Sequence, residues 1–160
     1  MIGSPGSGKS TLATEIARRT GLPLIHLDQH YWRPGWVAPD DETWAGQMQA
    51  LAAGERWVMD GNYGGTLNLR LPRADTVVWL DLPTRTCLCR IARSALRHRG
   101  EVRPSMAEGC PEQFRPDFIL HVLHFRRRSR RRIVRHLQGF TGTLLQFRRQ
   151  SKAARWLAAL

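Results

Sequence analysis

Apolar and polar residues alternate along the chain in blocks that predict strands and helices in turn. Short apolar runs predict buried strands at 22–27, 56–59, 76–80 and 143–147. Between these runs, apolar side chains recur at helical spacing, most clearly in the segment that begins at Lys9 and ends before Gly21. We therefore expect helices at about 9–20, 84–97 and 153–160, a helix capped by Asp40 or Asp41 that runs to about Ala53, and one long basic helix at 116–137.

This alternation of strands and helices predicts an α/β protein built on a parallel sheet of about five strands. The first strand should precede Gly3, but only Met1 and Ile2 stand there, so we expect this strand to be largely missing from the chain. Losing three or four buried apolar side chains costs roughly 5–10 kcal/mol, and we expect the natural polypeptide to begin upstream. The length of 160 residues fits a single domain. Residues 98–115 combine Gly, Pro and charge without a period and should form a mobile loop.

The start of the chain carries the clearest motif. Gly3, Ser4, Pro5, Gly6, Ser7, Gly8, Lys9, Ser10 and Thr11 fit the phosphate-loop pattern G-x-x-x-x-G-K-[ST]. Its glycines allow the backbone to curl so that N–H groups form a nest for an anion. In this pattern Lys9 reaches the β- and γ-phosphates, and the Ser10 hydroxyl holds Mg²⁺. A flexible Gly/Ser turn is the alternative, but the apolar helical stripe that follows directly favours a site for a nucleoside triphosphate.

Three aspartates follow predicted strands, at the sheet edge where ligands of parallel sheets bind. Asp60, which should follow the strand beside the phosphate loop, is expected to hold Mg²⁺ through water; a turn before Gly61 is the alternative. Asp81 should cap the next helix, with metal binding as the less favoured role. Asp28 either orients an acceptor hydroxyl and accepts its proton, or is a turn residue.

The net charge of +12 comes almost entirely from arginine, because Lys9 and Lys152 are the only lysines. Such a charge is typical of nucleic-acid binding, of a polyphosphate site or of a solvated surface. Arg90 and Arg93 lie one helical turn apart, and they either face the transferring phosphoryl group or lie on a solvated helix face. The run 126–132 spreads arginines around a helix, so some of them must face solvent.

Location is indicated by three features of the sequence. No apolar run approaches the roughly 20 residues of a membrane span. The phosphate loop stands at the N-terminus, so we expect no signal peptide. Cys87, Cys89 and Cys110 lack C-x-x-C spacing, which is typical of reduced thiols. We expect a cytoplasmic protein with no membrane partner.

The chain resembles the adenylate-kinase-related P-loop kinases in the order of its motifs: GSPGSGKST, then Met59-Asp60-Gly61, then VVWLDLP before Cys89-Arg90-Ile91. It is similar, more narrowly, to a bacterial group known as DNA topology modulation proteins in the stretches LPLIHLDQHYWRPGW, GERWVMDGNY, LRLPRADTVVWLD, RPSMAEGCPE and FRRR. The resemblance implies a three-layer P-loop NTPase fold in which Asp60 serves Mg²⁺ and Arg90 packs on adenine. It also implies a lid at about 98–137 with further phosphate-binding arginines, and an adenine-edge loop that includes Arg149 and Lys152.

The chain departs from nucleoside-monophosphate kinases after Asp60-Gly61. Asn62-Tyr63-Gly64-Gly65 stands where those kinases carry a proline and an arginine that binds the acceptor phosphate, and an aromatic loop at 31–36 replaces their monophosphate-binding pattern. We therefore expect an acceptor other than AMP. Its binding site should include Asp28, His30, Tyr31, Trp32, Asn62 and Tyr63.

These features predict a kinase that uses ATP and Mg²⁺ to phosphorylate an unidentified small molecule, with Lys9, Asp28, Arg90 and Arg93 as catalytic residues. The alternative is a nucleotide-regulated DNA-binding protein that affects DNA topology, which the charge and the arginine run support. No helix-turn-helix or zinc-finger pattern accompanies that charge, so we expect only weak, non-specific binding of nucleic acid.

Overall fold

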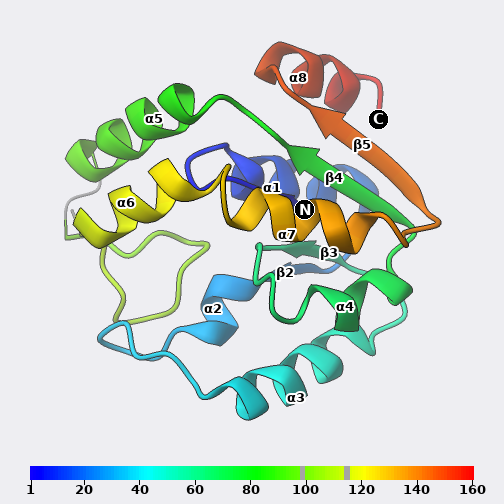
Figure 1. Cartoon of the computed structure of the whole chain (residues 1–160), viewed down its shortest axis with the longest axis horizontal. Helices are drawn as coiled ribbons and strands as arrows, with labels where there is room; N and C mark the ends of the chain where they lie inside the picture. Colours follow the sequence, from blue (N-terminus) through cyan, green and yellow to red (C-terminus); the bar gives the residue numbers. More distant parts are fainter. Residues whose placement is uncertain (98–99, 114–115) are drawn as a thin grey trace.

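Parallel strands form the centre of the computed structural model, which describes residues 1–97, 100–113 and 116–160 (Figure 1). The strands are β1 (Ile2–Gly3), β2 (Leu24–His26), β3 (Val58–Asp60), β4 (Thr76–Leu80) and β5 (Thr143–Phe147). β4 pairs in parallel with β1 on one side and with β5 on the other, and β2 pairs in parallel with β3. The α/β class and the parallel pairing predicted from the sequence are therefore confirmed.

Hydrogen bonds join the two groups of strands at β1. The Met1 amino nitrogen donates to the Met59 carbonyl oxygen at 2.7 Å, and the Gly61 N–H donates to the Met1 carbonyl oxygen at 3.2 Å. The Asn62 side chain accepts from the Gly3 N–H at 2.9 Å and donates to the Gly3 carbonyl oxygen at 2.7 Å. These bonds place β1 between β3 and β4. The ladders themselves form a three-stranded sheet, β1-β4-β5, and a two-stranded sheet, β2-β3, in place of the predicted single sheet of about five strands.

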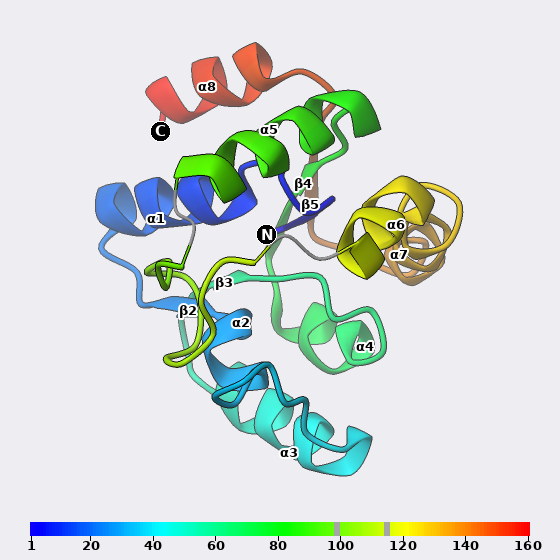
Figure 2. The same cartoon turned by 90° about the vertical axis from the view of Figure 1, so that its left-hand side faces the viewer.

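Helices cover both faces of these strands (Figure 2). α1 (Lys9–Thr20) and α8 (Gln150–Ala158) lie on one face, and α4 (Leu67–Arg70) and α7 (Ser129–Leu137) lie on the other. Successive strand residues point to opposite faces, so Val78 of β4 packs on the face covered by α1 and α8, and Trp79 packs on the face covered by α4 and α7. The core therefore lies on both faces of the strands, with β4 at its centre.

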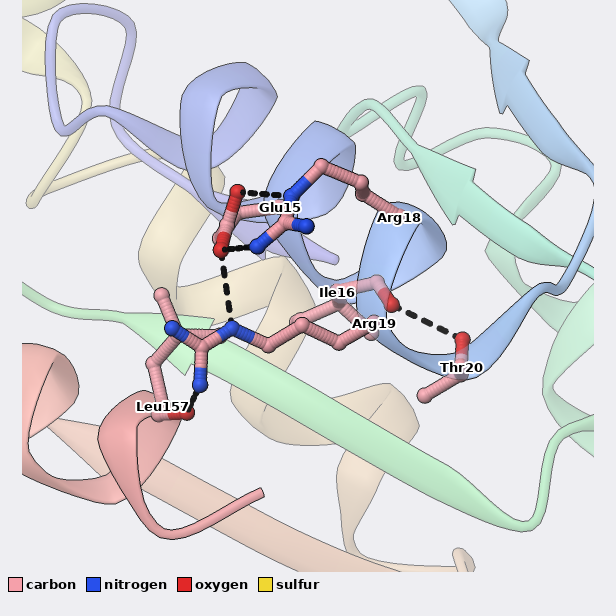
Figure 3. A network of polar contacts seen from close by, with 6 residues as sticks. All are labelled: Glu15, Ile16, Arg18, Arg19, Thr20 and Leu157. Atoms are coloured by element: carbon pink, nitrogen blue, oxygen red, sulfur yellow. Dashed lines mark hydrogen bonds and ion pairs between the residues drawn. The ribbon is translucent and has the colours of Figure 1, made fainter.

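A polar network ties the C-terminal turn of α1 to α8 (Figure 3). The Glu15 carboxylate accepts hydrogen bonds from Arg18 at 2.9 and 2.7 Å and from Arg19 at 2.8 Å. Arg19 also donates to the Leu157 carbonyl oxygen at 2.5 Å. The hydrogen bonds from Arg18 and Arg19 lower the pKa of Glu15 to about 2. In the folded protein this carboxylate therefore stays ionised at acidities that would protonate an ordinary glutamate.

The remaining helices are α2 (Leu27–Tyr31), α3 (Asp41–Ala52), α5 (Thr84–Arg97) and α6 (Pro116–His124), with a 3-10 turn at Leu71–Arg73. The Asp40 side chain accepts from the Thr43 N–H at 2.7 Å, so Asp40 rather than Asp41 caps α3. Within the described ranges, no helix is both long enough and apolar enough to cross a membrane.

The long basic helix predicted at 116–137 is two helices, α6 and α7, with a break at 125–128. The two halves bury apolar side chains against different elements. Val122 of α6 packs with Cys87 and Ile91 of α5, whereas Phe125 and Ile133 pack beneath the strands. A single straight helix cannot serve both surfaces, so the chain turns between them.

The bounds of one strand and one helix also differ from the prediction. The strand expected at 22–27 is shorter, because Leu27 begins α2 and is fully buried among α3 residues. Similarly, α8 begins at Gln150 rather than near Ala153.

The predicted mobile loop at 98–115 lies partly outside the described residues, at 98–99 and 114–115. Its described part, 100–113, has no helix or strand but is packed against the aromatic loop. Met106, Ala107 and Cys110 are buried there, with Trp32 and Trp36 against them. The Gln29 side chain donates to the Pro104 carbonyl oxygen at 2.6 Å. The segment 100–113 is therefore a loop, as predicted, but a packed one, because it buries apolar side chains that a solvated loop would leave exposed. Its mobility stays a prediction.

Candidate nucleotide-binding site

The loop between β1 and α1 has the curl expected of a phosphate loop. Gly6 and Gly8 adopt φ values of +75° and +89°, which other residues rarely adopt, and Gly8 is the N-cap of α1. A side chain at Gly6 would lie 2.5 Å from the Cys87 carbonyl oxygen, because α5 packs directly on the loop. The first turn of α1 carries no acidic residue, so no carboxylate of that turn competes for the positive end of the helix dipole.

Lys9 and Ser10 begin α1, and both are only partly exposed. Lys9 forms neither an ion pair nor a side-chain hydrogen bond with any described residue, which leaves its ammonium free for a ligand. Arg90 of α5 reaches across the loop, where its Nη1 donates to the Ser7 carbonyl oxygen at 3.0 Å. Arg93 is exposed one turn further along α5, without a bond to the described loop residues. The structure therefore brings Arg90, and not Arg93, to the loop.

Asp60 ends β3 opposite His26, the residue in register with it on β2. His26 Nδ1 lies 3.1 Å from Asp60 Oδ2, and both side chains are buried. The other carboxylate oxygen, Oδ1, is buried without a hydrogen-bond partner among the described residues. Burial alone would raise the pKa of Asp60, but the bond with His26, the charge of Lys9 and the Ser10 hydroxyl outweigh it and lower that pKa. Asp60 is thus an ionised carboxylate whose Oδ1 accepts no hydrogen bond of normal geometry, although the Ser10 hydroxyl lies close enough to lower the pKa of Asp60.

The Asp60 carboxylate and the Ser10 hydroxyl are the groups here that could hold a magnesium ion. In the part of the chain that the structure describes, no three His, Cys, Asp or Glu side chains form a metal site. Mg²⁺ bound with a nucleotide needs fewer protein ligands, because phosphates and water supply most of its oxygens. The buried, unpartnered Oδ1 of Asp60, close to the Ser10 hydroxyl that affects its pKa, matches this limited ligand set.

The predicted acceptor residues come together in part. The Tyr63 hydroxyl donates to Asp28 Oδ1 at 2.5 Å, although Asp28 lies in the first turn of α2 and not at a strand end. Burial, then the charge of Asp28 and the bond to it, raise the pKa of Tyr63 far above its usual range, so the phenol stays neutral. The Tyr31 ring lies 4.6 Å from the Tyr63 ring and 4.9 Å from the Trp44 ring. Aromatic rings therefore form a wall beside the Asp28 carboxylate.

The other predicted acceptor residues have different surroundings. His30 is exposed on α2. Trp32 packs against Trp36, with ring centroids 5.4 Å apart, and against the segment 106–110. Both polar atoms of the Asn62 side chain are engaged by Gly3, which gives Asn62 a role in holding β1 to the loop after β3.

Asp81 was predicted to cap α5, but it binds the arginine-rich region instead. Its carboxylate accepts from Arg130 at 3.1 and 3.2 Å and from the Gln146 side chain at 2.9 Å, and Arg126 lies 4.0 Å away. The Arg130 guanidinium also lies 5.3 Å from the centre of the Trp79 ring. Asp81 is buried directly after β4. A buried carboxylate without a charged partner costs much free energy, which explains why Asp81 pairs with Arg130 instead of capping α5.

Sequence reasoning missed two buried polar residues of the site. His26 lies within an apolar strand, and its position opposite Asp60 depends on a pairing register that the sequence does not specify. Arg70 is buried on α4 and donates to the carbonyl oxygens of Gly61, at 2.7 Å, and Asn62. Burial lowers the pKa of Arg70 to about 10, which leaves it charged at neutral pH. For His26 the available signal was a polar residue inside an apolar run, and for Arg70 it was a charged residue between two leucines.

Arg149 and Lys152, predicted to border the adenine, are exposed at the start of α8. Their role stays a prediction. No protein-family model matches the chain, and no curated protein matches it. The assignment of a function therefore depends on the site itself: a curled glycine loop, an unpaired Lys9 and an ionised Asp60 at one end of the parallel strands.

Proposed function

We propose that the chain is a P-loop kinase of three-layer P-loop NTPase fold that transfers the γ-phosphoryl group of ATP to a hydroxyl group of a small molecule. The observation that carries this proposal is the buried, unpartnered Oδ1 of Asp60 beside the phosphate loop. Leaving a buried carboxylate oxygen without a partner costs free energy in the absence of a ligand. A cation held at a nucleotide's phosphates would supply that partner.

The phosphate half of the reaction rests on positioning and on charge. The loop N–H groups and Lys9 would hold the β- and γ-phosphates, and Arg90 would add a guanidinium at the same loop. Ser10 and Asp60 would hold Mg²⁺, which when bound neutralises part of the phosphate charge. His26 keeps Asp60 oriented through Oδ2, so that Oδ1 faces the metal side. Arg93, which is exposed, has no part in this proposal.

The acceptor half rests on Asp28 and Tyr63. Because the neutral Tyr63 phenol donates to Oδ1 of Asp28, the carboxylate is held in one orientation with Oδ2 left for an acceptor hydroxyl. Asp28 would orient that hydroxyl and accept its proton as the oxygen attacks phosphorus. Tyr31 and the packed segment 100–113 would exclude water from the acceptor.

The test is ATP consumption in the presence of nucleosides, nucleotides and small hydroxylated compounds, with Lys9→Ala and Asp60→Asn as controls. We expect one class of acceptor to stimulate turnover, and both variants to abolish it while their circular dichroism spectra stay unchanged. Turnover that persists in Lys9→Ala would contradict the mechanism.

A nucleotide-regulated DNA-binding protein is the second candidate, favoured by exposed arginines in the connection between α6 and α7 and on α7, such as Arg127, Arg128 and Arg131. It is tested by the salt dependence of DNA binding. Affinity that depends on ATP and on DNA topology at physiological salt would support it. Weak binding that disappears at that salt, without preference, would exclude it.

A further inference from the structure

A basic pocket lies between the loop that follows β3 and the helix α7. It has a volume of about 380 Å³ and is lined by Gly64, Gly65, Arg132, Arg135 and His136. None of these residues belongs to the loop 3–11 or to the acceptor wall described above. The roles proposed above for the phosphate loop and for the acceptor use none of these residues.

The pocket concentrates positive charge that no carboxylate offsets. Arg132, Arg135 and His136 are spaced i, i+3 and i+4 on α7 and therefore share one face of the helix. Its lining contains no Asp or Glu, and neither arginine forms an ion pair with a described residue. The helix dipole favours cations in the last turn, which accounts for Arg135 and His136, but not for Arg132 one turn earlier.

The loop side of the pocket is formed by two glycines, Gly64 and Gly65. Tyr63 adopts a φ of +34°, unusual for a residue with a side chain, while its hydroxyl is held by Asp28. A Cβ atom on Gly64 would lie 3.0 Å from Arg132 Cδ, so the arginine stem packs tightly against the backbone at this glycine. Gly65 has no neighbouring atom within 4 Å of the equivalent position, and it is exposed. Neither glycine N–H donates to a group of the described residues.

We propose that this pocket binds the phosphate group of a small phosphate monoester. Arginine guanidinium groups pair with phosphate oxygens through two parallel N–H bonds, and free backbone N–H groups add to such sites. Two arginines on one helix face, a histidine and an open glycine backbone supply those donors together. The proposal is independent of phosphoryl transfer, because it requires neither ATP nor Mg²⁺.

The experiment follows the amide resonances of Gly64 and Gly65 by NMR while inorganic phosphate, and then glycerol phosphate, is added at constant ionic strength. The protein carries Lys9→Ala to weaken binding at the phosphate loop. Arg132→Gln and Arg135→Gln each remove one pocket cation, whereas Arg131→Gln removes the same charge from an exposed position on α7 outside the pocket. Gly65→Asp places a carboxylate in open space, and thermal unfolding checks that each variant is folded.

We expect saturable shifts at Gly64 and Gly65, with the dissociation constant raised roughly tenfold or more by either pocket variant. Arg131→Gln should change it by less than about twofold, and Gly65→Asp should abolish the shifts. Equal losses in all three arginine variants would overturn the proposal, since they indicate diffuse charge. Shifts confined to Gly6 and Gly8 would overturn it as well, and so would a DNA oligonucleotide that binds the pocket more tightly than glycerol phosphate.

Discussion

His26 Nδ1 lies 3.1 Å from Oδ2 of Asp60 across the paired strands β2 and β3, and this contact leaves Oδ1 of Asp60 as the oxygen that accepts no hydrogen bond of normal geometry. A carboxylate accepts hydrogen bonds, so the histidine nitrogen that faces it carries the proton. The pair fixes the rotation of the carboxylate in the way that outer partners fix metal ligands.

Replacing His26 should therefore weaken Mg²⁺-dependent nucleotide binding without touching the phosphate loop. We expect His26→Leu to reduce the affinity for ATP in the presence of Mg²⁺ by about 10–100-fold, and to change the affinity measured with EDTA by much less. Isothermal titration calorimetry under both conditions provides the measurement. Equal losses with and without Mg²⁺ would show that His26 acts on the fold rather than on Asp60.

Arg90 and Arg93 provide a matched pair on one helix, since only Arg90 contacts the loop. Arg90→Gln should lower the affinity for ATP roughly tenfold or more, because it removes a charged donor at the phosphates. Arg93→Gln should leave the affinity within about twofold. Fluorescent-nucleotide titration compares the two. A larger effect at Arg93 would mean that the helix α5 moves when the nucleotide binds.

Tyr63→Phe removes the donor that orients Asp28 and keeps the ring in the aromatic cluster. We expect the KM for the acceptor to rise or kcat to fall, while ATP affinity stays unchanged, because the two halves of the site use different residues. Asp28→Asn should reduce turnover more strongly, since it removes the proton acceptor. Steady-state kinetics with the acceptor found by screening separates these effects; full activity in both variants would remove Asp28 from the mechanism.

Asp81 should contribute to stability rather than to nucleotide binding. Asp81→Asn removes the negative charge to which the Arg130 and Gln146 side chains donate hydrogen bonds. We expect a loss of about 2 kcal/mol in the free energy of unfolding. Asp75→Asn, at an exposed position, should change it by less than about 0.5 kcal/mol. Urea denaturation measures both. If the two variants were equally stable, the Asp81–Arg130 contact would be energetically neutral.

The lowered pKa of Glu15 predicts that the fold loses stability at acidic pH. Its pKa in the fold is about 2, below the roughly 4.3 of an unfolded chain, so its stabilisation is complete above about pH 4.3 and is lost as the pH falls toward about 2. Glu15→Gln should therefore flatten the decline of the melting temperature in that interval. Glu55→Gln, at an exposed glutamate, should not. Identical pH profiles for Glu15→Gln and the parent chain would contradict the assignment.

Local signals in the sequence were sufficient for most elements and for the curled glycine loop before α1. The apolar run at Thr76–Leu80 and the helix at Thr84–Arg97 occur where predicted, because burial pattern and helix-starting residues act over short distances. The loop at Gly6 and Gly8 was also evident, since its conformation depends on glycine itself.

What the sequence could not provide depends on contacts between distant segments. The split of 116–137 into α6 and α7 follows from Val122 and Ile133 packing on different elements. Asp81 was assigned to the nearest helix, whereas its partners Arg130 and Gln146 come from far along the chain. The contact of His26 with Asp60 depends on strand register in the same way.

The most direct test of the central claim is calorimetric titration of ATP into the protein and into Lys9→Ala, each with and without Mg²⁺. The account predicts saturable binding that Mg²⁺ strengthens in the parent protein, and a folded Lys9→Ala variant whose affinity is at least roughly tenfold weaker. Equal affinity in the two proteins, or no binding of ATP to the parent protein, would contradict a phosphate-loop nucleotide site.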